Sequence, residues 1–154
     1  MLTIAITCNK RISISAFPSG WFMNSEAYVA FLKETAHKWR NLRSHAIHFS
    51  SLHWQYDNAR CHVSAITSDY ICKSGLTLMK QAPYSPDLNL LDRWINQRIK
   101  KDLRGECLTS SADVVRATQR CLHNIPEDTY RNELLKLEHH CKRIVDAGGD
   151  YITD

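Results

Sequence analysis

The chain has 154 residues, of which 44% are hydrophobic and 23% are charged, and its formal charge is +4 at pH 7. These values are ordinary for one globular domain with its own core. No run of residues approaches the roughly 18 apolar residues of a membrane span, and the N-terminus lacks the basic and apolar regions of a signal peptide. We therefore expect no contact with a membrane, whereas the basic balance permits contact with nucleic acid without requiring it.

Six cysteines are scattered along the chain at irregular spacing: Cys8, Cys61, Cys72, Cys107, Cys121 and Cys141. A disulfide framework places its cysteines in a short, loop-rich secreted chain, which this sequence does not resemble. A zinc site requires a second Cys/His pair at a suitable spacing, and neither Cys61-His62 nor residues 139–141 has one. We expect reduced thiols in a cytosolic or nuclear protein.

The first third of the chain predicts a β-hairpin followed by a helix. Apolar and polar residues alternate over 2–8 and again over 11–17, with a turn at Asn9-Lys10 between them. Asn24 and Ser25 offer an N-cap for a helix that continues to about residue 40.

The middle of the chain predicts strand, helix and strand in turn. Residues 52–56 alternate and lead directly into Asp57. A helix is predicted over 62–74, ending near Gly75, and a short strand over 76–80.

The second half of the chain is predicted to be helical. A turn at residues 85–87 leads into a helix that stops at Gly105, with an apolar stripe of Leu88, Leu91, Ile95, Ile99 and Leu103. Ser110 and Asp113 form a capping pattern for a helix to about residue 123. Pro126 fits the first turn of a last helix, whose apolar face is Tyr130, Leu134, Leu137 and Cys141. The sequence shows no internal repeat and no domain boundary.

Two carboxylates lie at the boundaries of predicted elements. Asp57 follows a strand and Asp92 lies early in a helix. Ligands collect at strand ends in α/β sheets, and converging carboxylates there can hold divalent cations about 3.5–4 Å apart for phosphoryl chemistry. Taken singly, each acid also has an ordinary structural interpretation. Asp57 suits a turn, Asp87 a helix cap and Asp92 the favourable first turn of a helix.

The two segments that contain these acids are more specific together. Residues 57–62 have the pattern Asp-Asn-Ala-x-x-His, residues 84–92 have Tyr-Ser-Pro-Asp-Leu-Asn-x-x-Asp, and 34 residues separate Asp57 from Asp92. This combination resembles the second and third acidic blocks of mariner-like DNA transposases of the DDE/DDD superfamily. The similarity continues over residues 18–28 and the C-terminal residues 130–151, and so covers essentially the whole chain.

The resemblance implies an α/β, ribonuclease H-like fold, in which a mixed sheet is flanked by helices. It assigns Asp57 as the second and Asp92 as the third catalytic acid, and it places Asn58 and His62 in supporting motif positions. It also implies Mg²⁺ or Mn²⁺ as the cofactor. We expect the two carboxyl groups to lie within roughly 4–8 Å of each other, close enough to share metal ions.

The sequence departs from the family pattern at two points. Leu90 stands where the family usually has proline, which we expect to loosen the helix start that orients Asp92. The first acid has no counterpart, because residues 1–56 contain no aspartate and their only carboxylates are Glu26 and Glu34. We therefore expect residues 1–154 to be a partial catalytic domain that lacks its first, central strand and the DNA-binding region before it. A truncated gene copy, a mis-started gene model and one exon of a longer protein all account for this.

The resulting expectation is a transposase-derived protein related to metal-dependent DNA cleavage and strand transfer, inactive as this fragment and with metal binding weakened or lost. Its partners would be DNA, a second copy or an intact transposase subunit, and its location the nucleus. The alternative is a domesticated, non-catalytic module that binds DNA or another transposase subunit. An unfolded translation product is the third possibility. Candidate basic contacts are Lys38, Arg40, Arg43, Arg93, Arg98, Lys100, Lys101 and Arg104.

Overall fold

The structure is a computed structural model that describes residues 1–7, 11–18, 20–42 and 48–152. Its strands and helices follow in this order: β1 (Leu2–Ile6), β2 (Arg11–Ala16), α1 (Ser25–Leu42), the 3₁₀ turn η1 (Phe49–Ser51), β3 (His53–Gln55), α2 (Ala65–Ser74), β4 (Thr77–Met79), the 3₁₀ turn η2 (Pro86–Leu88), the π-helical turn η3 (Leu91–Ile95), α3 (Asn96–Asp102), α4 (Ser111–His123) and α5 (Glu127–Asp146). In the described part of the chain, no helix combines the length and the apolar character needed to cross a membrane.

The predicted hairpin is confirmed. β1 and β2 pair antiparallel from Leu2 opposite Ala16 to Ile6 opposite Arg11, with an irregularity between Ala5 and Ile6. The predicted turn at 9–10 lies outside the described residues. Because side chains alternate between the two faces of a strand, Ala5 packs into one core whereas Ile4 packs against another.

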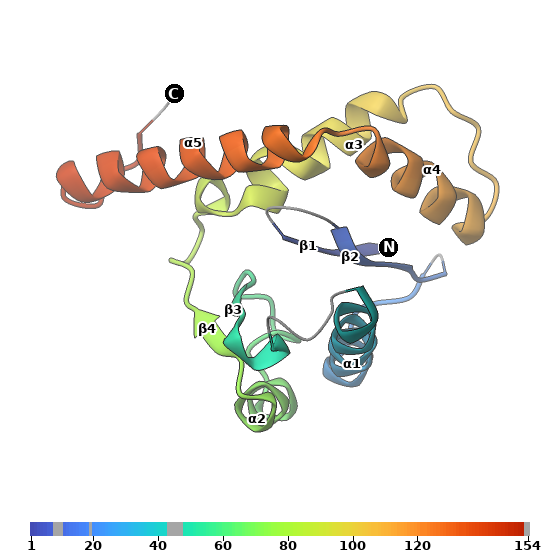
Figure 1. Cartoon of the computed structure of the whole chain (residues 1–154), viewed down its shortest axis with the longest axis horizontal. Helices are drawn as coiled ribbons and strands as arrows, with labels where there is room; N and C mark the ends of the chain where they lie inside the picture. The colour runs from blue at the N-terminus through green and yellow to red at the C-terminus, as the bar shows by residue number, and fades with distance from the viewer. Residues whose placement is uncertain (8–10, 19, 43–47, 153–154) are drawn as a thin grey trace.

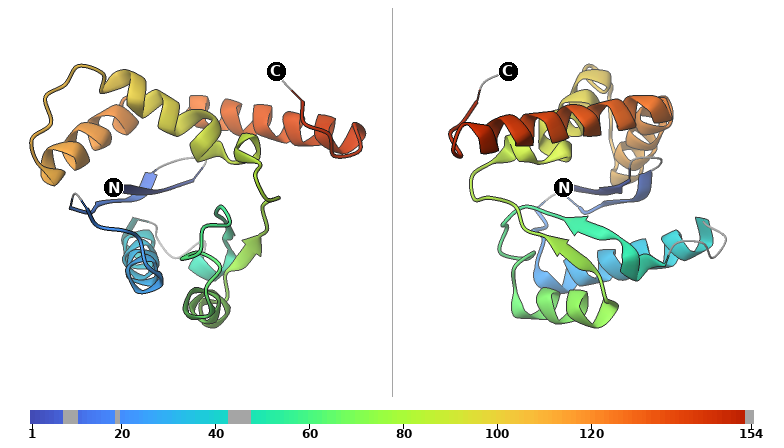
Figure 2. Two further views of the ribbon diagram at one scale, coloured as in Figure 1. Left: turned by 180° about the vertical axis from the view of Figure 1, so that it is seen from behind. Right: turned by 60° about the vertical axis from the view of Figure 1, so that its left-hand side comes forward.

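Two hydrophobic cores lie on opposite faces of this hairpin. The first core contains Ala5, Tyr28, Phe31, Leu32, Trp39, Ile71 and Leu76. The second contains Ile14, Ile95, Ile99, Cys121, Leu122, Ile125 and Tyr130. The ribbon views show the hairpin lying between α1 on one side and the α3–α5 helices on the other (Figure 1 and Figure 2). The fold is therefore layered, with strands between two groups of helices.

The middle segment forms a parallel β–α–β unit. β3 pairs with β4 from His53 opposite Thr77 to Gln55 opposite Met79, and α2 connects the two strands. α2 begins three residues later than predicted because the Ser64 hydroxyl accepts a hydrogen bond from the Thr67 N–H and caps the helix there. It ends as predicted at Gly75, whose φ of +68° is the left-handed conformation that glycine adopts without strain.

The strands form two separate two-stranded sheets within the described residues, one antiparallel and one parallel. In these sheets β1 pairs with β2 and β3 pairs with β4, and the described part of the chain contains no pairing of β1 with β3. The described strands therefore do not form one continuous sheet, and the absence of a central strand stays a prediction.

The prediction of one continuous helix from residue 88 to 103 is wrong. Asn89 has an extended backbone (φ −114°, ψ 118°), which separates the 3₁₀ turn η2 from the helical turn η3. The predicted capping of α4 is confirmed, since Ser110 and Asp113 form a complete capping box. α5 begins after Pro126 and continues to Asp146, beyond the predicted apolar face that ends at Cys141.

Candidate active site

The candidate site is built at one end of the parallel pair β3 and β4. Parallel strands end at the same edge of a sheet, so the residues that follow them lie together there. Asp57 and Asn58 follow β3, and Gln81 follows β4. The Asn58 Nδ2 donates to the Gln81 backbone oxygen at 3.2 Å, which links the two strand ends directly.

Two glutamines connect this edge to the segment that leads to Asp92. Gln81 Nε2 donates to the Ser85 carbonyl at 2.7 Å, and Gln55 Nε2 donates to the Leu88 carbonyl at 2.9 Å. Each bond satisfies a carbonyl of an irregular segment that has few partners of its own. η2 and the helical turn after it are therefore anchored to the end of the sheet.

A cleft of about 380 Å³ lies between these segments. It is lined by Asp57, Asn58, Ala59, Gln81, Ala82, Pro83, Tyr84, Ser85, Pro86 and Asp92. The fold thus brings both predicted acids and the predicted supporting residue Asn58 into one cleft. The separation of roughly 4–8 Å between the two carboxyl groups stays a prediction.

Asp57 is held by hydrogen bonds to one of its carboxylate oxygens. Oδ1 accepts from the Ala59 N–H at 3.1 Å and lies 2.7 Å from His62 Nδ1. Since Nδ1 also faces the Asp57 backbone oxygen at 3.3 Å, both of its neighbours are acceptors, and Nδ1 therefore acts as the donor. His62 is predicted to support the site, and it lies where it can orient Asp57.

The His62 ring is fixed by two aromatic rings of the first core. Its centroid lies 4.1 Å from that of Tyr28 and 5.1 Å from that of Tyr56. Burial raises the pKa of the Tyr28 phenol, which therefore stays protonated and accepts a hydrogen bond from Trp54 Nε1 at 3.2 Å. The orientation of Asp57 thus depends on packing in the first core.

Asp92 is held differently, by one neutral amide on each carboxylate oxygen. Asn89 Nδ2 donates to Oδ2 and Asn96 Nδ2 donates to Oδ1, both at 3.0 Å. Asn96 follows Asp92 by four residues, a spacing that places two side chains on one helix face, whereas Asn89 precedes Asp92 by three residues and lies before the helical turn. Sequence reasoning assigned neither a role, although that spacing was visible. Asp92 also lies in a π-helical turn, a feature that is frequent at functional sites.

The helix start beside Asp92 does not require the proline that the resemblance implies. Leu90 has φ −58° and ψ −35°, which are values that a proline would also adopt. The Asn89 side-chain oxygen accepts a hydrogen bond from the Leu91 N–H at 3.0 Å and caps the first turn. Asn89 therefore fixes both the helix start and the Asp92 carboxylate.

The structural interpretation of Asp87 as a helix cap is wrong. η2 has no side-chain cap, and Asp87 Oδ2 instead lies 2.9 Å from His140 Nε2. The exposed fractions of the two side chains are only 11% and 2%. This buried pair joins α5 to the segment that carries Asp92.

The donor set of the cleft determines which metal it fits. No group of three His, Cys, Asp or Glu side chains is placed to hold a metal among the residues that the structure describes. Glu26 and Glu34 do not line the cleft, and Glu34 pairs with Lys38 at 2.6 Å. Gln81 Oε1 is buried in the wall without a hydrogen-bond partner in the described chain. Carboxylate and amide oxygens are the donor types that a hard cation such as Mg²⁺ prefers, but two carboxylates are too few for a pair of cations.

No protein-family model and no curated protein matches the chain. Solved structures do match. The Mos1 transposase catalytic domain with raltegravir and Mg is 19% identical, with a TM-score of 0.89 over 99% of this chain and 76% of that chain. The catalytic domain of Mos1 mariner transposase is also 19% identical, with a TM-score of 0.85 over 99% of this chain and 75% of that chain.

A pre-cleavage Mos1 transpososome gives 18% identity and a TM-score of 0.90, again over 99% of this chain but only 45% of that one. Among these structures, one catalytic domain holds Mg and another holds Mn. Sequence identities this low establish the fold alone. The chain therefore has the ribonuclease H-like fold of the mariner transposase catalytic domain.

Proposed function

We propose that the chain is part of a mariner-like transposase catalytic domain, in which Asp57 and Asp92 are two of the carboxylates for metal-dependent cutting and joining of DNA strands. The observation that carries this proposal is their shared cleft at the end of β3. Two further findings support it: the fold over 99% of the chain and the 34-residue interval between the two acids.

Asp57 and Asp92 would hold one Mg²⁺ or Mn²⁺ together with waters and phosphate oxygens of the substrate. A divalent cation in such a site supplies a Lewis acid for the phosphate and lowers the pKa of a bound water. Asp57 has an oxygen for this purpose, because both of its hydrogen bonds within the described residues involve Oδ1. Asn89 and Asn96 keep the Asp92 carboxylate in place through neutral donors, which do not compete with the cation as a charged group would.

We further propose that residues 1–154 alone do not cleave DNA. The sequence contains two of the three acids that the resemblance implies, and the loss of a major electrostatic element typically lowers a rate by about 10²–10³-fold. On these grounds the metal would bind weakly and the reaction would be undetectable until a third carboxylate is supplied.

Metal binding provides the first test. Mn²⁺ titration followed by electron paramagnetic resonance should show one weak site in the unmodified chain. Asp57→Asn and Asp92→Asn should each abolish it, whereas Asp69→Asn, an exposed acid on α2 that does not line the cleft, should leave it unchanged. His62→Ala should lower the affinity about 10-fold, as is typical of residues that orient a ligand. Equal binding by all variants would contradict the site.

A cleavage assay with Mg²⁺ or Mn²⁺ provides the second test. We expect no strand cleavage or transfer by the 154-residue chain. Cleavage that disappears in Asp57→Ala would show that Glu26, Glu34 or another subunit supplies the missing carboxylate, and the proposal of inactivity would then be wrong.

A non-catalytic module that binds DNA or a transposase subunit is the second candidate. The observation that favours it is the cluster of basic side chains on α5 and η3, which does not depend on a metal. Under either proposal the protein would act on DNA in the nucleus. Imaging of the tagged chain tests that location, and a signal confined to the cytoplasm would contradict it.

A further inference from the structure

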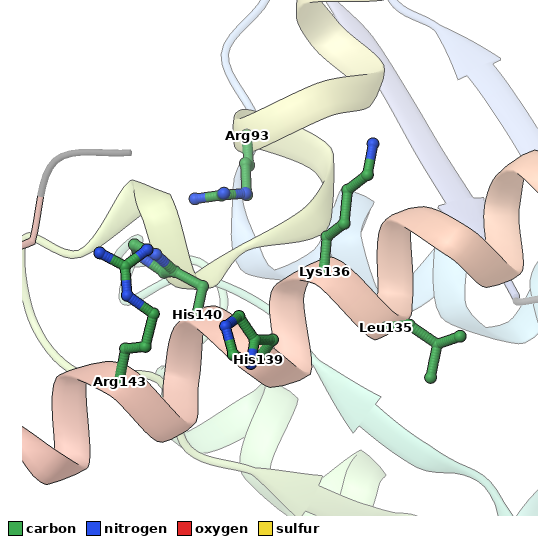
Figure 3. Close-up of a pocket in the computed structure, with 6 residues that line it drawn as sticks. All are labelled: Arg93, Leu135, Lys136, His139, His140 and Arg143. Atoms are coloured by element: carbon green, nitrogen blue, oxygen red, sulfur yellow. The ribbon is translucent and has the colours of Figure 1, made fainter.

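A second, larger pocket lies between α5 and η3. Its volume is about 470 Å³, and it is lined by Arg93, Leu135, Lys136, His139, His140 and Arg143. Five of these six side chains are basic or can become so, and none of the six is acidic. Figure 3 shows Arg93 reaching from η3 toward the space that Arg143 and His140 enter from α5.

The basic side chains of the pocket also have partners within the protein. His140 is bound to Asp87, and Lys136 pairs with Glu133 at 2.7 Å. Arg93 and Arg143 also interact within the protein. A guanidinium has five N–H donors, however, so each arginine can share its donors between a protein partner and an anion. Two guanidinium groups that converge on one space repel each other, and an anion between them relieves that repulsion.

The basic pocket and the acidic cleft lie on two sides of one segment. Asp92 lines the cleft and Arg93, the next residue, lines the pocket. Successive residues of a helix point about 100° apart, so neighbours in sequence open to different sides. The same segment is joined to α5 by the pair of Asp87 and His140. The cleft and the pocket therefore share one segment, which presents Asp92 to one and Arg93 to the other.

We propose that the pocket formed by Arg93, Lys136 and Arg143 binds a backbone phosphate of DNA. Charge favours phosphate, and arginine donates to phosphate oxygens in pairs. The wall also contains Leu135, an apolar side chain with 61% of its surface exposed. Apolar surface suits the sugar of a phosphodiester and offers nothing to inorganic phosphate. Lys136 and Arg143 are two turns apart on α5, about 10.5 Å along its axis, so the pocket can follow a short stretch of backbone.

This inference rests on the proposed function insofar as DNA is the ligand, but it needs neither metal nor catalysis. The test is therefore binding of a fluorescent DNA duplex, measured by anisotropy in EDTA at several NaCl concentrations. The variants are Arg93→Gln and Arg143→Gln. The matched controls are Lys73→Gln on α2 and Lys142→Gln on α5, which remove the same charge from exposed positions outside the pocket.

We expect Arg93→Gln and Arg143→Gln each to weaken binding roughly ten-fold and to lower the slope of log K against log salt by about one, as for the loss of one phosphate contact. The controls should change binding much less. Equal losses in all four variants, or no DNA binding by the unmodified chain, would overturn the proposal. Thermal unfolding of each variant separates lost binding from lost structure.

Competition with inorganic phosphate distinguishes the source of the ligand. At matched ionic strength, millimolar phosphate should not displace DNA. Displacement that disappears in Arg143→Gln would assign the pocket to a free phosphate and overturn the choice of DNA. Asp57→Asn and Asp92→Asn should bind DNA normally in EDTA. If these aspartate variants lose Mn²⁺ binding but still bind DNA, the pocket proposal is unaffected. If the arginine variants bind DNA as well as their lysine controls do, the pocket proposal fails and the proposed metal site is unaffected.

Discussion

The half of the molecule that carries Asp57 differs in construction from the half that carries Asp92. The Asp57 half consists of α1, α2 and the short strands β3 and β4 around the first core. The Asp92 half consists of α3, α4, α5 and the turns before them around the second core. The hairpin lies between the halves, and its β2 strand contacts both α1 and α4. Each half thus supplies one acid to a cleft that neither half forms alone.

The two halves also satisfy their backbone groups differently. The helical half closes its own hydrogen bonds, as helices do, and α4 has a complete capping box. In the other half, β3 and β4 form a sheet of only two three-residue strands. A two-stranded sheet this small is not stable by itself and depends on the helices packed against it. We therefore expect the Asp57 half to open first.

The largest expected effect concerns the sheet edges in residues 1–154 expressed alone. Within the described residues, β1 and β3 each pair on one side only. Buried amides without partners cost about 1–3 kcal/mol each, against a total stability of about 5–15 kcal/mol. We expect association through these edges, seen as oligomers in size-exclusion chromatography, or poor solubility. A monomer with a cooperative transition above about 45 °C would contradict this.

Truncating one fully buried side chain in each core compares the halves directly. Leu32 and Ile95 are both 0% exposed. Leu32→Ala and Ile95→Ala should each lower the free energy of unfolding by about 2–5 kcal/mol, as measured by urea denaturation. If the halves open separately, Leu32→Ala should mainly favour opening of the Asp57 half, and Ile95→Ala should mainly favour opening of the Asp92 half.

Two native cysteines report that opening. Cys61 packs against the first core and Cys121 lies in the second. Burial raises the pKa of both thiols, that of Cys121 to about 11, so alkylation at neutral pH is slow in the folded state and becomes faster when the half opens. Leu32→Ala should speed labelling of Cys61 more than of Cys121, detected by peptide mass spectrometry, with exposed Cys72 as the reference. Equal acceleration at both thiols would show one cooperative unit.

The elements most readable from the sequence were those with local signals. The hairpin alternation, the end of α2 at Gly75 and the Ser110 cap each depend on a few neighbouring residues. The break at Asn89 was missed because the apolar stripe continues across it, and periodicity does not register one extended residue.

The residues of the candidate site also divide into those with a local sequence signal and those without one. Asp57 and Asp92 were identified from motifs, and the fold places them in one cleft. Gln55 and Gln81 have no local signal, since their partners are carbonyls of an irregular segment elsewhere in the chain. The basic pocket was equally invisible, because Arg93 and Arg143 come from elements 50 residues apart that meet only in the folded chain.

Helix caps give a smaller and better matched comparison. Ser64 caps α2 in one half, and Ser110 caps α4 in the other. Ser64→Ala and Ser110→Ala should each cost about 1 kcal/mol in urea denaturation at pH 7. If Ser64→Ala lowered the free energy of unfolding much more than Ser110→Ala, the stability of the Asp57 half would depend strongly on this one hydrogen bond.

The two caps should also differ in their response to pH. Hydrogen bonds from Ser110, Arg116 and Thr109 lower the pKa of Asp113 below its ordinary value of 3.8. A carboxyl group with a lowered pKa in the folded state stabilises the protein above its unfolded pKa, and that contribution is lost as the pH falls through the folded value. The cost of Ser110→Ala should therefore shrink below pH 3.8, whereas that of Ser64→Ala, which has no acid in its cap, should not. Parallel pH curves would contradict the capping box.

Leu90→Pro has the smallest expected effect, and it tests whether the helix start beside Asp92 depends on Asn89. The backbone already suits proline, because Leu90 has φ −58° and Asn89 is extended, as residues before proline are. Proline would restrict the unfolded chain, which stabilises by about 0.4–1 kcal/mol. The loss of the leucine side chain, only 9% exposed, offsets this gain. The melting temperature should therefore change by no more than about 2–4 °C.

Asn89→Ala should lower the stability more than Leu90→Pro changes it, and it should also weaken Mn²⁺ binding, because it removes the cap and a donor to Asp92 together. If Leu90→Pro restored the stability of the Asn89→Ala variant, then proline at this position could replace the Asn89 cap, and the helix start would not depend on Asn89.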